Sequence, residues 1–394
     1  MMMKLSLLLV LLLPQLSLAQ SAAPLKVFIM VGQSNMQGHG YMNVKDDATG
    51  QFRNGTLEWM IQKFPKEYNK LKSADGSWKA RPDVWITYNR QNIENVRVEV
   101  NQFGNLLPGF GGDPGQTDQM GPELGFGWTM AEALNKDNVQ QQQQQQPPKQ
   151  QILLLKVAWG GRSLAVDFRP PSSGGVTGLY YETLMAQIFR TLSRLPQLFP
   201  KYATTSIGSY ELAGFVWHQG WNDGCDVNMT AEYEFNLANL IRDVRTDLGV
   251  SKLPVSIGVS GFNGYTPEPR RDAIIAAQFA VANATKYPEF AGTVVAVETR
   301  GFVRPPPLSP GTQSYHWWNN CETYWLVGKA MAEGMIQLLR LSQSSSPPVN
   351  VYKQKSLLRN NNNNQLNLLP FGYPSEETIS LARRKSRSLL HSLR

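Results

Sequence analysis

The strongest constraint on the fold is a regular alternation of short apolar runs with longer amphipathic segments. The apolar runs predict buried strands, and the segments between them predict helices. The expected strands span residues 25–31, 152–158, 214–218, 255–259 and 293–297. The expected helices span residues 122–134, 181–194, 230–248, 271–285 and 322–341. This alternation predicts an α/β fold, with a mainly parallel sheet covered on both faces. In such sheets a binding site forms in the loops beyond the carboxyl ends of the strands.

Three stretches break the alternation. Residues 41–120 are rich in Gly, Asn and aromatic side chains, and we interpret them as a long excursion that lines the site. Seven consecutive Gln at 140–146, followed by two Pro, predict a disordered insertion over residues 140–150. The segment 342–394 begins SQSSSPP and contains five consecutive Asn, which predicts a disordered tail. One catalytic domain is therefore expected over residues 20–341.

The N-terminus has the form of a secretory signal peptide. A single Lys precedes a leucine-rich run, and small residues at 17–19 suit cleavage. The apolar run is interrupted at Pro14, and no other stretch reaches the length that a membrane span needs. We therefore expect a signal peptide over residues 1–19, a mature protein without a membrane span, and a location outside the cell or in the secretory lumen.

Glycosylation sequons and the distribution of charge agree with that compartment. The sequons predict glycans at Asn54, Asn228 and Asn283. The formal charge is +8, but the tail from Ser342 onward contains eight basic and only two acidic residues. The body of the protein is therefore nearly neutral, which argues against a nucleic-acid partner. Oligomeric state cannot be inferred from the sequence.

The first predicted strand ends in a sequence suited to nucleophilic catalysis. Gly32-Gln33-Ser34 places a serine hydroxyl just past the strand, and the glycine permits a sharp turn. A serine hydroxyl becomes a nucleophile only when a base removes its proton. Of the four histidines, His391 lies in the tail and His218 lies within a predicted strand. His316, which precedes the last helix, is the favoured base.

His39 is the remaining histidine, in a glycine-flanked turn five residues after the serine, and it is the weaker candidate for the base.

Two further strand ends carry groups that can donate hydrogen bonds to an oxyanion. Gly160 and Gly161 expose backbone N–H groups, although the same pair also suits a simple tight turn. Asn222 follows the strand at 214–218 and offers a side-chain amide.

Taken in order, these segments resemble the SGNH hydrolase superfamily, and within it the sialate O-acetylesterase-like group of the carbohydrate esterase family 6 type. The resemblance covers about residues 25–340. It is carried by VGQSNM at 31–36, GPELGFG at 121–127, WGGRSL at 159–164, HQGWND at 218–223 and YHWWNNCETYWLVGKAM at 315–331.

The resemblance implies a three-layer α/β/α flavodoxin-like fold and hydrolysis of O-acetyl esters on sugars. Ser34 would be the nucleophile and His316 the base. The backbone of Ser34 and of Gly160 or Gly161, with the Asn222 amide, would hold the oxyanion. An acetylated carbohydrate would be the substrate. We expect no cofactor and no metal, since the sequence has no His/Cys cluster with zinc spacing.

The acid that would orient the histidine is less certain. Relatives commonly carry Asp three residues before it, whereas this chain has Gln313, which cannot stabilise an imidazolium as a carboxylate does. Asp226 is our first candidate for this acid, and Asp223 and Glu298 are its rivals. A Ser–His dyad helped by a backbone carbonyl is the fourth possibility.

Two further expectations concern the rim of the site. Gln33, Arg162, Gln219 and Trp221 are the expected substrate-binding residues, because polar groups beside aromatic rings suit sugars. Cys225 and Cys321 each follow a site motif by five residues, so a disulfide between them is expected if the motifs meet in a secreted protein.

Two other functions remain open. The first is a catalytically inactive carbohydrate-binding protein on the same fold, which the missing Asp at position 313 would favour. The second is an SGNH esterase or lipase of other specificity, which an exposed apolar groove would favour.

Overall fold

A computed structural model describes residues 23–91, 99–113, 116–136, 149–199, 209–345 and 352–353. The predicted signal peptide at 1–19, the Gln run at 140–146 and most of the predicted tail lie outside these ranges. Of the residues at 140–150, only the last two are described.

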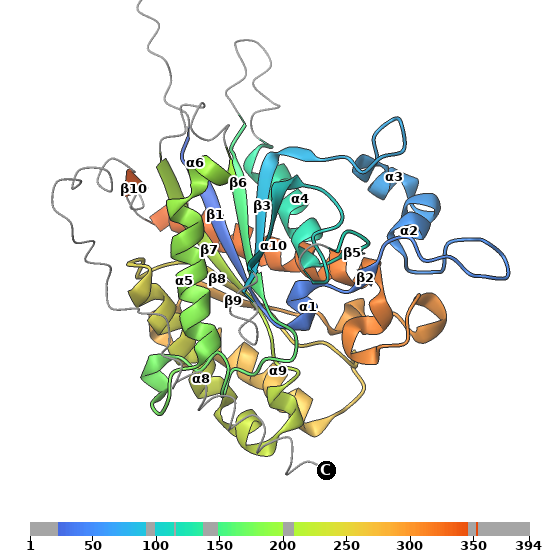
Figure 1. The fold of residues 1–394 in the computed structure, drawn as a ribbon. Coiled ribbons are helices and arrows are strands. Elements are labelled where there is room, and N and C mark those ends of the chain that lie inside the picture. Colours follow the sequence, from blue (N-terminus) through green and yellow to red (C-terminus); the bar gives the residue numbers. More distant parts are fainter. Residues whose placement is uncertain are drawn as a thin grey trace, which may run out of the picture.

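The centre of the molecule is a mostly parallel sheet (Figure 1). Its five central strands are parallel and adjacent in the order β6-β1-β7-β8-β9. They are β1 (Leu25–Gly32), β6 (Ile152–Ala158), β7 (Ser209–His218), β8 (Val255–Gly258) and β9 (Val294–Val297). Counted along the chain, this order is 2-1-3-4-5, the order of flavodoxin-like sheets. The prediction of a mainly parallel, flavodoxin-like sheet is confirmed.

Two further strands extend the sheet beyond β6, where the sequence predicted only an excursion. β3 (Arg81–Gln91) pairs in parallel with β6, and β4 (Glu99–Leu106) pairs antiparallel with β3. The sequence did not predict β3 because its short apolar core, Val84–Ile86, is flanked by charged and amide residues. The rest of 41–120 holds a second small sheet of β2 (Gly40–Tyr41) and β5 (Gln119–Met120), together with α2 (Leu57–Lys63) and α3 (Pro65–Tyr68).

The long helices begin and end within a few residues of the expected bounds. They are α4 (Pro122–Leu134), α5 (Leu179–Ser193), α8 (Val227–Asp247), α9 (Pro269–Val281) and α10 (Cys321–Ser345). Short helical segments complete the described chain: α1 (Ser34–Gln37), α6 (Leu195–Leu198), η1 (Asn69–Leu71), η3 (Pro171–Ser173), η4 (Asp223–Cys225), η5 (Pro288–Phe290), η6 (Arg300–Phe302), η7 (Pro306–Leu308) and η8 (Ser314–Asn319).

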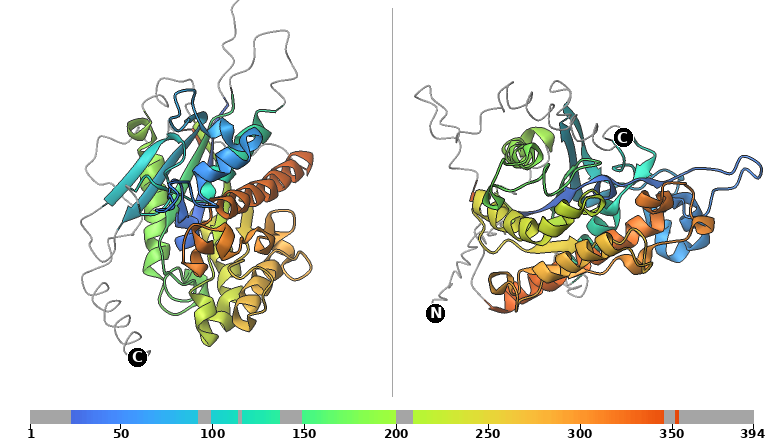
Figure 2. Two further views of the ribbon diagram at one scale, coloured as in Figure 1. Left: turned by 90° about the vertical axis from the view of Figure 1, so that its right-hand side faces the viewer. Right: turned by 90° about the horizontal axis from the view of Figure 1, so that it is seen from below.

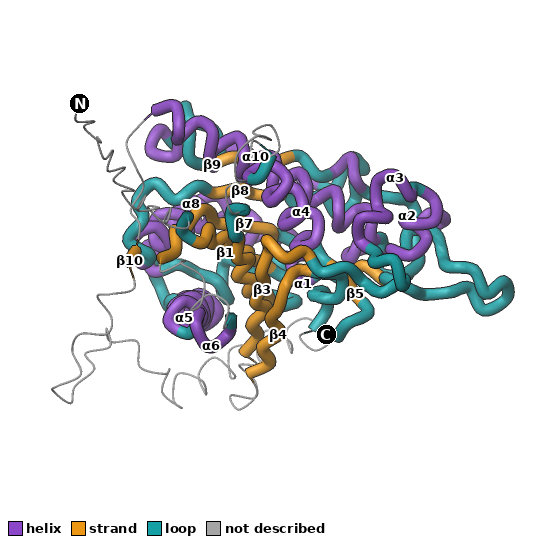
Figure 3. Tube along the Cα trace, turned by 90° about the horizontal axis from the view of Figure 1, so that it is seen from above, coloured by secondary structure: helices purple, strands orange, loops and turns teal. Residues whose placement is uncertain are grey.

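The helices form two layers, one on each face of the sheet (Figures 2 and 3). Val27, Ile29 and Val31 of β1 belong to a core that includes residues of α5, α8 and α9. Phe28 and Met30, which point to the opposite face, belong to a core that includes residues of α4 and α10. Because side chains alternate along a strand, a run that is apolar at every position signals burial on both faces. The expected three-layer α/β/α arrangement is confirmed.

The C-terminal boundary lies further along the chain than the sequence suggested. Helix α10 continues to Ser345, past the expected end of the domain at 341. Tyr352 and Lys353 then form β10, which pairs antiparallel with the beginning of β7. This pairing places part of the predicted disordered tail on the sheet. Among the residues that the structure describes, no helix is both long and apolar enough to cross a bilayer.

Candidate active site

The predicted site residues come from loops at the carboxyl ends of the parallel strands. Ser34 follows β1, Gly160 follows β6, and Asn222 follows β7. The strand order reverses between β1 and β7, and ligands bind at such switch points because loops diverge there. The fold therefore brings these three motifs, which are far apart in sequence, to one edge of the sheet.

The turn that carries Ser34 depends on close backbone packing. A Cβ on Gly32 would lie 2.0 Å from the His218 carbonyl oxygen, so only glycine fits between β1 and β7. The chain then enters the four-residue helix α1, whose first residue is Ser34. The Ser34 side chain is half-buried, while the residues on both sides of it are buried. This geometry holds the hydroxyl in a fixed place at the edge of the sheet.

Gly160 lies directly beside the serine. A Cβ on Gly160 would lie 3.6 Å from the Ser34 Cβ and 2.8 Å from the Gln37 Oε1. Gly161 has a φ of 69°, in the left-handed region that favours glycine. The Asn222 Nδ2 donates a hydrogen bond to the Gly161 carbonyl at 2.5 Å. The structure thus places Gly160 next to Ser34 and joins Asn222 to the same glycine loop.

Two predicted substrate-binding residues hold these loops together instead. Gln33 is 2% exposed, and its Oε1 accepts hydrogen bonds from the backbone N–H groups of Gly220 and Asn222. Gln219 is 1% exposed, and its Nε2 donates to the Arg162 carbonyl and to Asp223. Side chains so enclosed cannot face a substrate, which corrects the prediction for Gln33 and Gln219.

Asp223 also holds together the loops that follow β6 and β7. Its buried carboxylate accepts hydrogen bonds from the backbone N–H groups of Leu164 and Ala165 and from the Gln219 amide. Burial raises the pKa of Asp223 to about 6, and these hydrogen bonds act in the opposite direction. Asp223 therefore links the β6 and β7 loops, and its carboxylate is not the partner of His316.

His316 reaches the site from η8, the segment that precedes α10. The Asn35 Nδ2, next to the serine, donates to the Tyr315 carbonyl at 3.0 Å. The Tyr324 hydroxyl of α10 donates to the Asn35 Oδ1 at 2.9 Å. Asn35 is thus the link between the serine turn and the histidine loop. Sequence reasoning did not single it out, although it follows Ser34 directly in the GQSNM motif.

The partner of the histidine is the residue that the sequence analysis set aside. The His316 Nδ1 lies 3.0 Å from the Gln313 Oε1, which also accepts from the Asn319 Nδ2 at 3.3 Å. With an acceptor at Nδ1, the ring carries its proton on Nδ1 and leaves Nε2 free to act as a base. Burial, reinforced by the charge of His39, lowers the pKa of His316 to about 3. The imidazole is therefore neutral at ordinary pH.

The three carboxylates proposed for that role have other partners. The Asp226 side chain caps α8, accepting from the backbone N–H groups of Asn228 and Met229. Glu298 accepts hydrogen bonds from Arg300 and forms an ion pair with it. Asp223 holds the loop amides described above. The structure corrects the prediction of a carboxylate partner, because Gln313 occupies the place beside His316 Nδ1.

His39 is also at the site. Its ring stacks on His316 with the ring centroids 4.1 Å apart and the planes 14° from parallel. The His39 Nδ1 lies 3.0 Å from the Gln119 Oε1 of β5. The two histidines that the sequence offered as rival bases are therefore neighbours. Among the described residues, no hydrogen bond joins the Ser34 hydroxyl to His316, and such catalytic contacts often tighten only when substrate binds.

The histidine loop has an unusual backbone. Trp317, Trp318 and Asn319 have φ values of 48°, 55° and 60°, in the left-handed region that non-glycine residues rarely adopt. Contacts on both sides hold the turn: the Asn319 Nδ2 donates to the His39 carbonyl, and Trp317 is 1% exposed and stacks on His218. Strained backbone of this kind is frequent at functional sites, where surrounding contacts determine it.

Comparison with known proteins places the chain in a protein family. The model of a protein family described as carbohydrate esterase, sialic acid-specific acetylesterase matches residues 24–286, more than half of the chain. The chain belongs to this family. It is therefore a carboxylic ester hydrolase of the acetylesterase type, as the sequence motifs indicated.

A search of solved structures also gave matches. A protein from Arabidopsis thaliana has a TM-score of 0.46 at 17% identity, with 79% of this chain and 98% of that chain covered. NanS has a TM-score of 0.46 at 13% identity, with 82% and 99% covered. A carbohydrate acetylesterase from Xanthomonas citri has a TM-score of 0.42 at 12% identity, with 78% of this chain and 55% of that chain covered. A comparison with curated proteins gave no match.

The rim of the esterase site contains aromatic and basic side chains. Trp221 is half-buried; the Arg271 guanidinium lies 3.4 Å from the centroid of its ring, and Tyr315 contacts it at 5.7 Å. Arg162 is partly exposed, forms an ion pair with Asp167 and lies over the Tyr180 ring. Both predicted rim residues remain available to a substrate on their exposed sides.

The predicted disulfide is wrong in this structure, where both cysteines are free. Cys225 is exposed on η4, and its Sγ donates to the Trp221 carbonyl. Cys321 is buried at the start of α10, and its Sγ donates to the Tyr41 carbonyl. Although their motifs share one site, the two thiols point to different partners. Burial raises the pKa of Cys321, which keeps this thiol protonated and unreactive.

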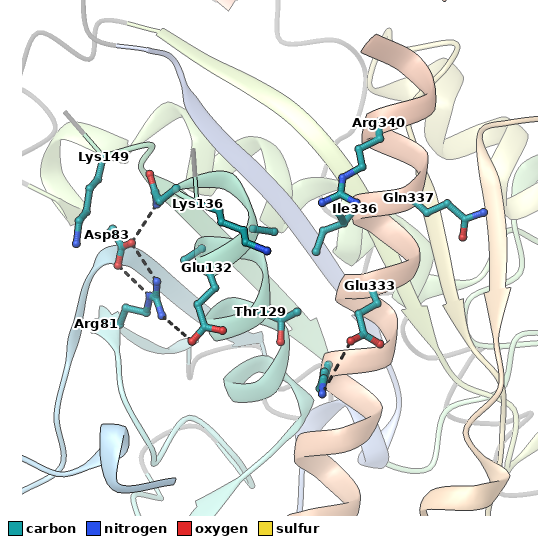
Figure 4. A pocket seen from close by; sticks show the side chains of 14 residues that line it. Arg81, Asp83, Thr129, Glu132, Lys136, Lys149, Glu333, Ile336, Gln337 and Arg340 are labelled. Atoms are coloured by element: carbon teal, nitrogen blue, oxygen red, sulfur yellow. Dashed lines mark hydrogen bonds and ion pairs between the residues drawn. The ribbon is translucent and has the colours of Figure 1, made fainter. Parts of the chain in front are cut away.

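A broad groove of about 950 Å³ lies elsewhere, between α4 and α10 (Figure 4). It is near the amino-terminal ends of β3 and β6, because Arg81 and Lys149 line it. Its charges are largely paired, Arg81 with Asp83 and Glu132, and Lys329 with Glu333. None of the described residues that line it is Ser, Cys or His. This groove is therefore separate from the loops that carry the predicted site residues.

Proposed function

We propose that this esterase is a secreted serine acetylesterase that removes O-acetyl groups from sugars through an acetyl-Ser34 intermediate. The observation that carries the proposal is the contact of the His316 Nδ1 with the Gln313 Oε1 in a loop tied to the serine turn. This contact favours the proton on Nδ1, so the His316 Nε2 carries a lone pair and can act as a base. Membership in a sialic acid-specific acetylesterase family supports the substrate class.

In the first half of the reaction, the Ser34 Oγ attacks the acetyl carbonyl carbon and its proton passes to the His316 Nε2. The carbonyl electron pair moves onto the oxygen, which becomes an oxyanion. Backbone N–H groups of Ser34 and of Gly160 or Gly161, with the Asn222 amide, stabilise that charge. The tetrahedral intermediate then breaks its bond to the sugar oxygen, which takes the proton from His316 as the deacetylated sugar leaves.

In the second half, a water attacks the acetyl-Ser34 carbonyl and gives its proton to His316. Collapse of this second intermediate releases acetic acid, which ionises to acetate, and the His316 proton returns to the Ser34 oxygen. Apart from the substrate and the attacking water, every group in these steps belongs to the chain. Gln313 orients the ring in both halves but carries no charge, so the imidazolium is less stabilised here than in a triad with a carboxylate.

The compartment is part of the same proposal. The sequence at 1–19 has the form of a signal peptide. Asn54, Asn228 and Asn283 are all exposed, as the attachment of glycans requires. A shift in electrophoretic mobility on enzymatic deglycosylation of the secreted protein, removed by Asn→Gln changes at the three sites, tests this part separately.

The serine mechanism is tested by acetate release from p-nitrophenyl acetate and from O-acetylated sialic acid and xylan. We expect Ser34→Ala to lower kcat by at least about a thousandfold, as loss of a nucleophile does. Ser193→Ala, at an exposed position near the end of α5, is the matched control and should be as active as wild type. Equal activity of Ser34→Ala and wild type would refute the proposed mechanism. Activity on the chromogenic ester alone would favour an esterase of other specificity.

A further inference from the structure

The stack of His39 on His316 is a feature of the site that the proposed mechanism does not use. His39 is brought there by a turn between α1 and β2 that needs glycine. Gly38 has a φ of 86°, and a Cβ on it would lie 2.0 Å from the Gly121 Cα. The Gln119 Oε1 then accepts from the His39 ring, and the Asn319 Nδ2 donates to the His39 carbonyl at 2.8 Å. His39 is thus held at its ring nitrogen by Gln119 and at its backbone carbonyl by Asn319.

The two stacked rings have matching surroundings. In each ring Nδ1 faces the oxygen of a glutamine amide, Gln119 for His39 and Gln313 for His316. An amide oxygen fixes the tautomer but does not compensate a positive charge. The ring face of His39, with its centroid 4.1 Å from that of His316, therefore lies against the charge that His316 acquires when it takes the proton of Ser34.

We propose, building on the serine mechanism above, that His39 is a positioning residue for His316. Its neutral ring holds the plane of the imidazole and supports the imidazolium, whereas its protonated ring blocks proton uptake from Ser34. An uncharged aromatic face attracts a cation placed over it. A second positive charge at stacking distance repels it, in line with the lowering effect of the His39 charge on the pKa of His316.

The other titratable groups around the stack do not take over this role. Tyr324 and Cys321 of α10 stay neutral, because burial raises the pKa of each. Glu123 of α4, a buried carboxylate, forms an ion pair with the buried Lys156. Tyr41 of β2, Tyr315 of η8 and exposed Asp118, next to Gln119, complete the set. Two titratable groups therefore contact the His316 ring directly: His39 stacks on its face with the centroids 4.1 Å apart, and Tyr315 meets it edge to face at 4.5 Å.

The first test separates the aromatic face from the bulk of the side chain. His39→Phe keeps a flat uncharged ring, and His39→Leu keeps a similar volume without one. We expect kcat of His39→Phe to stay within about threefold of wild type and kcat of His39→Leu to fall by about tenfold to a hundredfold, with little change in KM. Equal kcat for Leu and wild type, or an equal loss for Phe and Leu, would overturn the proposal.

The second test uses the charge of His39, which a merely structural role would not involve. Gln119→Glu places a carboxylate at the His39 Nδ1 and stabilises the protonated ring. The acid limb of the kcat profile should move to higher pH by about one to two units. In the double variant His39→Phe, Gln119→Glu the limb should stay where His39→Phe alone has it. A shift of the same size in both backgrounds would show that the effect does not pass through His39.

The outcome also distinguishes this inference from the mechanism on which it rests. If Ser34→Ala and His316→Ala are inactive while the His39 variants behave like wild type, the serine mechanism stands and the positioning role fails. If His316→Ala keeps its activity and His39→Phe loses it, His39 is itself the base, and both statements are overturned.

Discussion

The two halves of the active site are held in different ways. The Ser34 half is built on the sheet, between strands whose backbones touch, and a Cβ on Gly32 would collide with the His218 carbonyl. The His316 half stands on η8, outside the sheet, on three consecutive residues with left-handed backbone. The nucleophile is therefore positioned by regular structure, and the base by side-chain contacts that bridge distant parts of the chain.

This difference explains where sequence variation can be absorbed. At the serine turn, even one added carbon, such as a Cβ on Gly32, would collide with the packed backbone of β7. In the histidine loop, the Gln313 side chain takes the place expected for an aspartate, and the ring still has an acceptor at Nδ1. The loop can thus exchange one acceptor for another, with consequences for rate and pH dependence and smaller consequences for folding.

The largest predicted effect concerns the buried ion pair of Lys156 and Glu123, which contacts the end of α1, the helix that begins with Ser34. The Lys156 Nζ donates to the Glu123 carboxylate at 2.8 Å and to the carbonyls of Gln37 and Phe110. Both side chains are almost fully enclosed, and burial lowers the pKa of Lys156 while Glu123 opposes that change. Glu123→Gln leaves the ammonium without its counter-charge, and should lower the free energy of unfolding by about 3–5 kcal/mol.

Chemical denaturation measures this change, and the exposed pair of Lys329 with Glu333 provides the control. Its atoms lie 3.9 Å apart, so Glu333→Gln should alter the free energy of unfolding by less than about 0.5 kcal/mol. Similar values for the two variants would mean that the serine half is no more rigidly determined than the surface, and the contrast with the histidine half would disappear.

The second prediction concerns Gln313. Gln313→Ala removes the acceptor at the His316 Nδ1, so the ring can take the wrong tautomer, and kcat should fall by about tenfold to a hundredfold. Gln313→Asp supplies a negative charge, which raises the pKa of His316. Since the base must be neutral, the acid limb of the profile should then move to higher pH, by about one to three units.

Steady-state pH profiles and denaturation curves, measured on the same proteins, check this prediction. The free energy of unfolding of Gln313→Ala should change by about 2 kcal/mol or less, because two hydrogen bonds, each worth about 1 kcal/mol, are lost at a half-buried position. A loss of stability comparable to that of Glu123→Gln, or a kcat equal to wild type, would contradict the view that this loop serves rate more than folding.

The same contrast separates the parts of the site that can be predicted from the sequence from those that cannot. All five central strands and the five long helices follow from apolar periodicity, and the places of Ser34, Gly160 and Asn222 follow from the strand ends. The partner of His316 could not be found this way, since it depends on side-chain directions in a loop without regular structure. Asp226 was a reasonable candidate from its spacing, but the same spacing makes it the cap of α8.

Two other misses have related causes. β3 was not expected because its short apolar core is flanked by charged and amide residues that hide the strand pattern. The disulfide was expected from two motifs that meet, although adjacency of motifs does not fix the direction of a side chain. Bonding of two cysteines needs their Cβ atoms within about 4.5 Å, a condition that sequence cannot supply.

The smallest predicted effect tests the strain of the histidine loop itself. Trp318 has a φ of 55° and a half-buried side chain, whereas its neighbour Trp317 has a φ of 48° and is buried. Asn is more tolerant of left-handed backbone. Relief of strain should slightly exceed the lost packing in Trp318→Asn, so the free energy of unfolding should rise by less than about 1 kcal/mol.

Trp317→Asn is the matched comparison, with the same backbone region and a different environment. The Trp317 ring packs against His218, Phe262 and Tyr324, and its loss should lower the free energy of unfolding by about 3–5 kcal/mol. Opposite signs for the two variants, in denaturation measurements, would separate strain from packing within one turn. If Trp318→Asn also destabilises the protein by several kcal/mol, the left-handed backbone is held by its side chains at both positions, and the histidine loop is as closely determined as the serine turn.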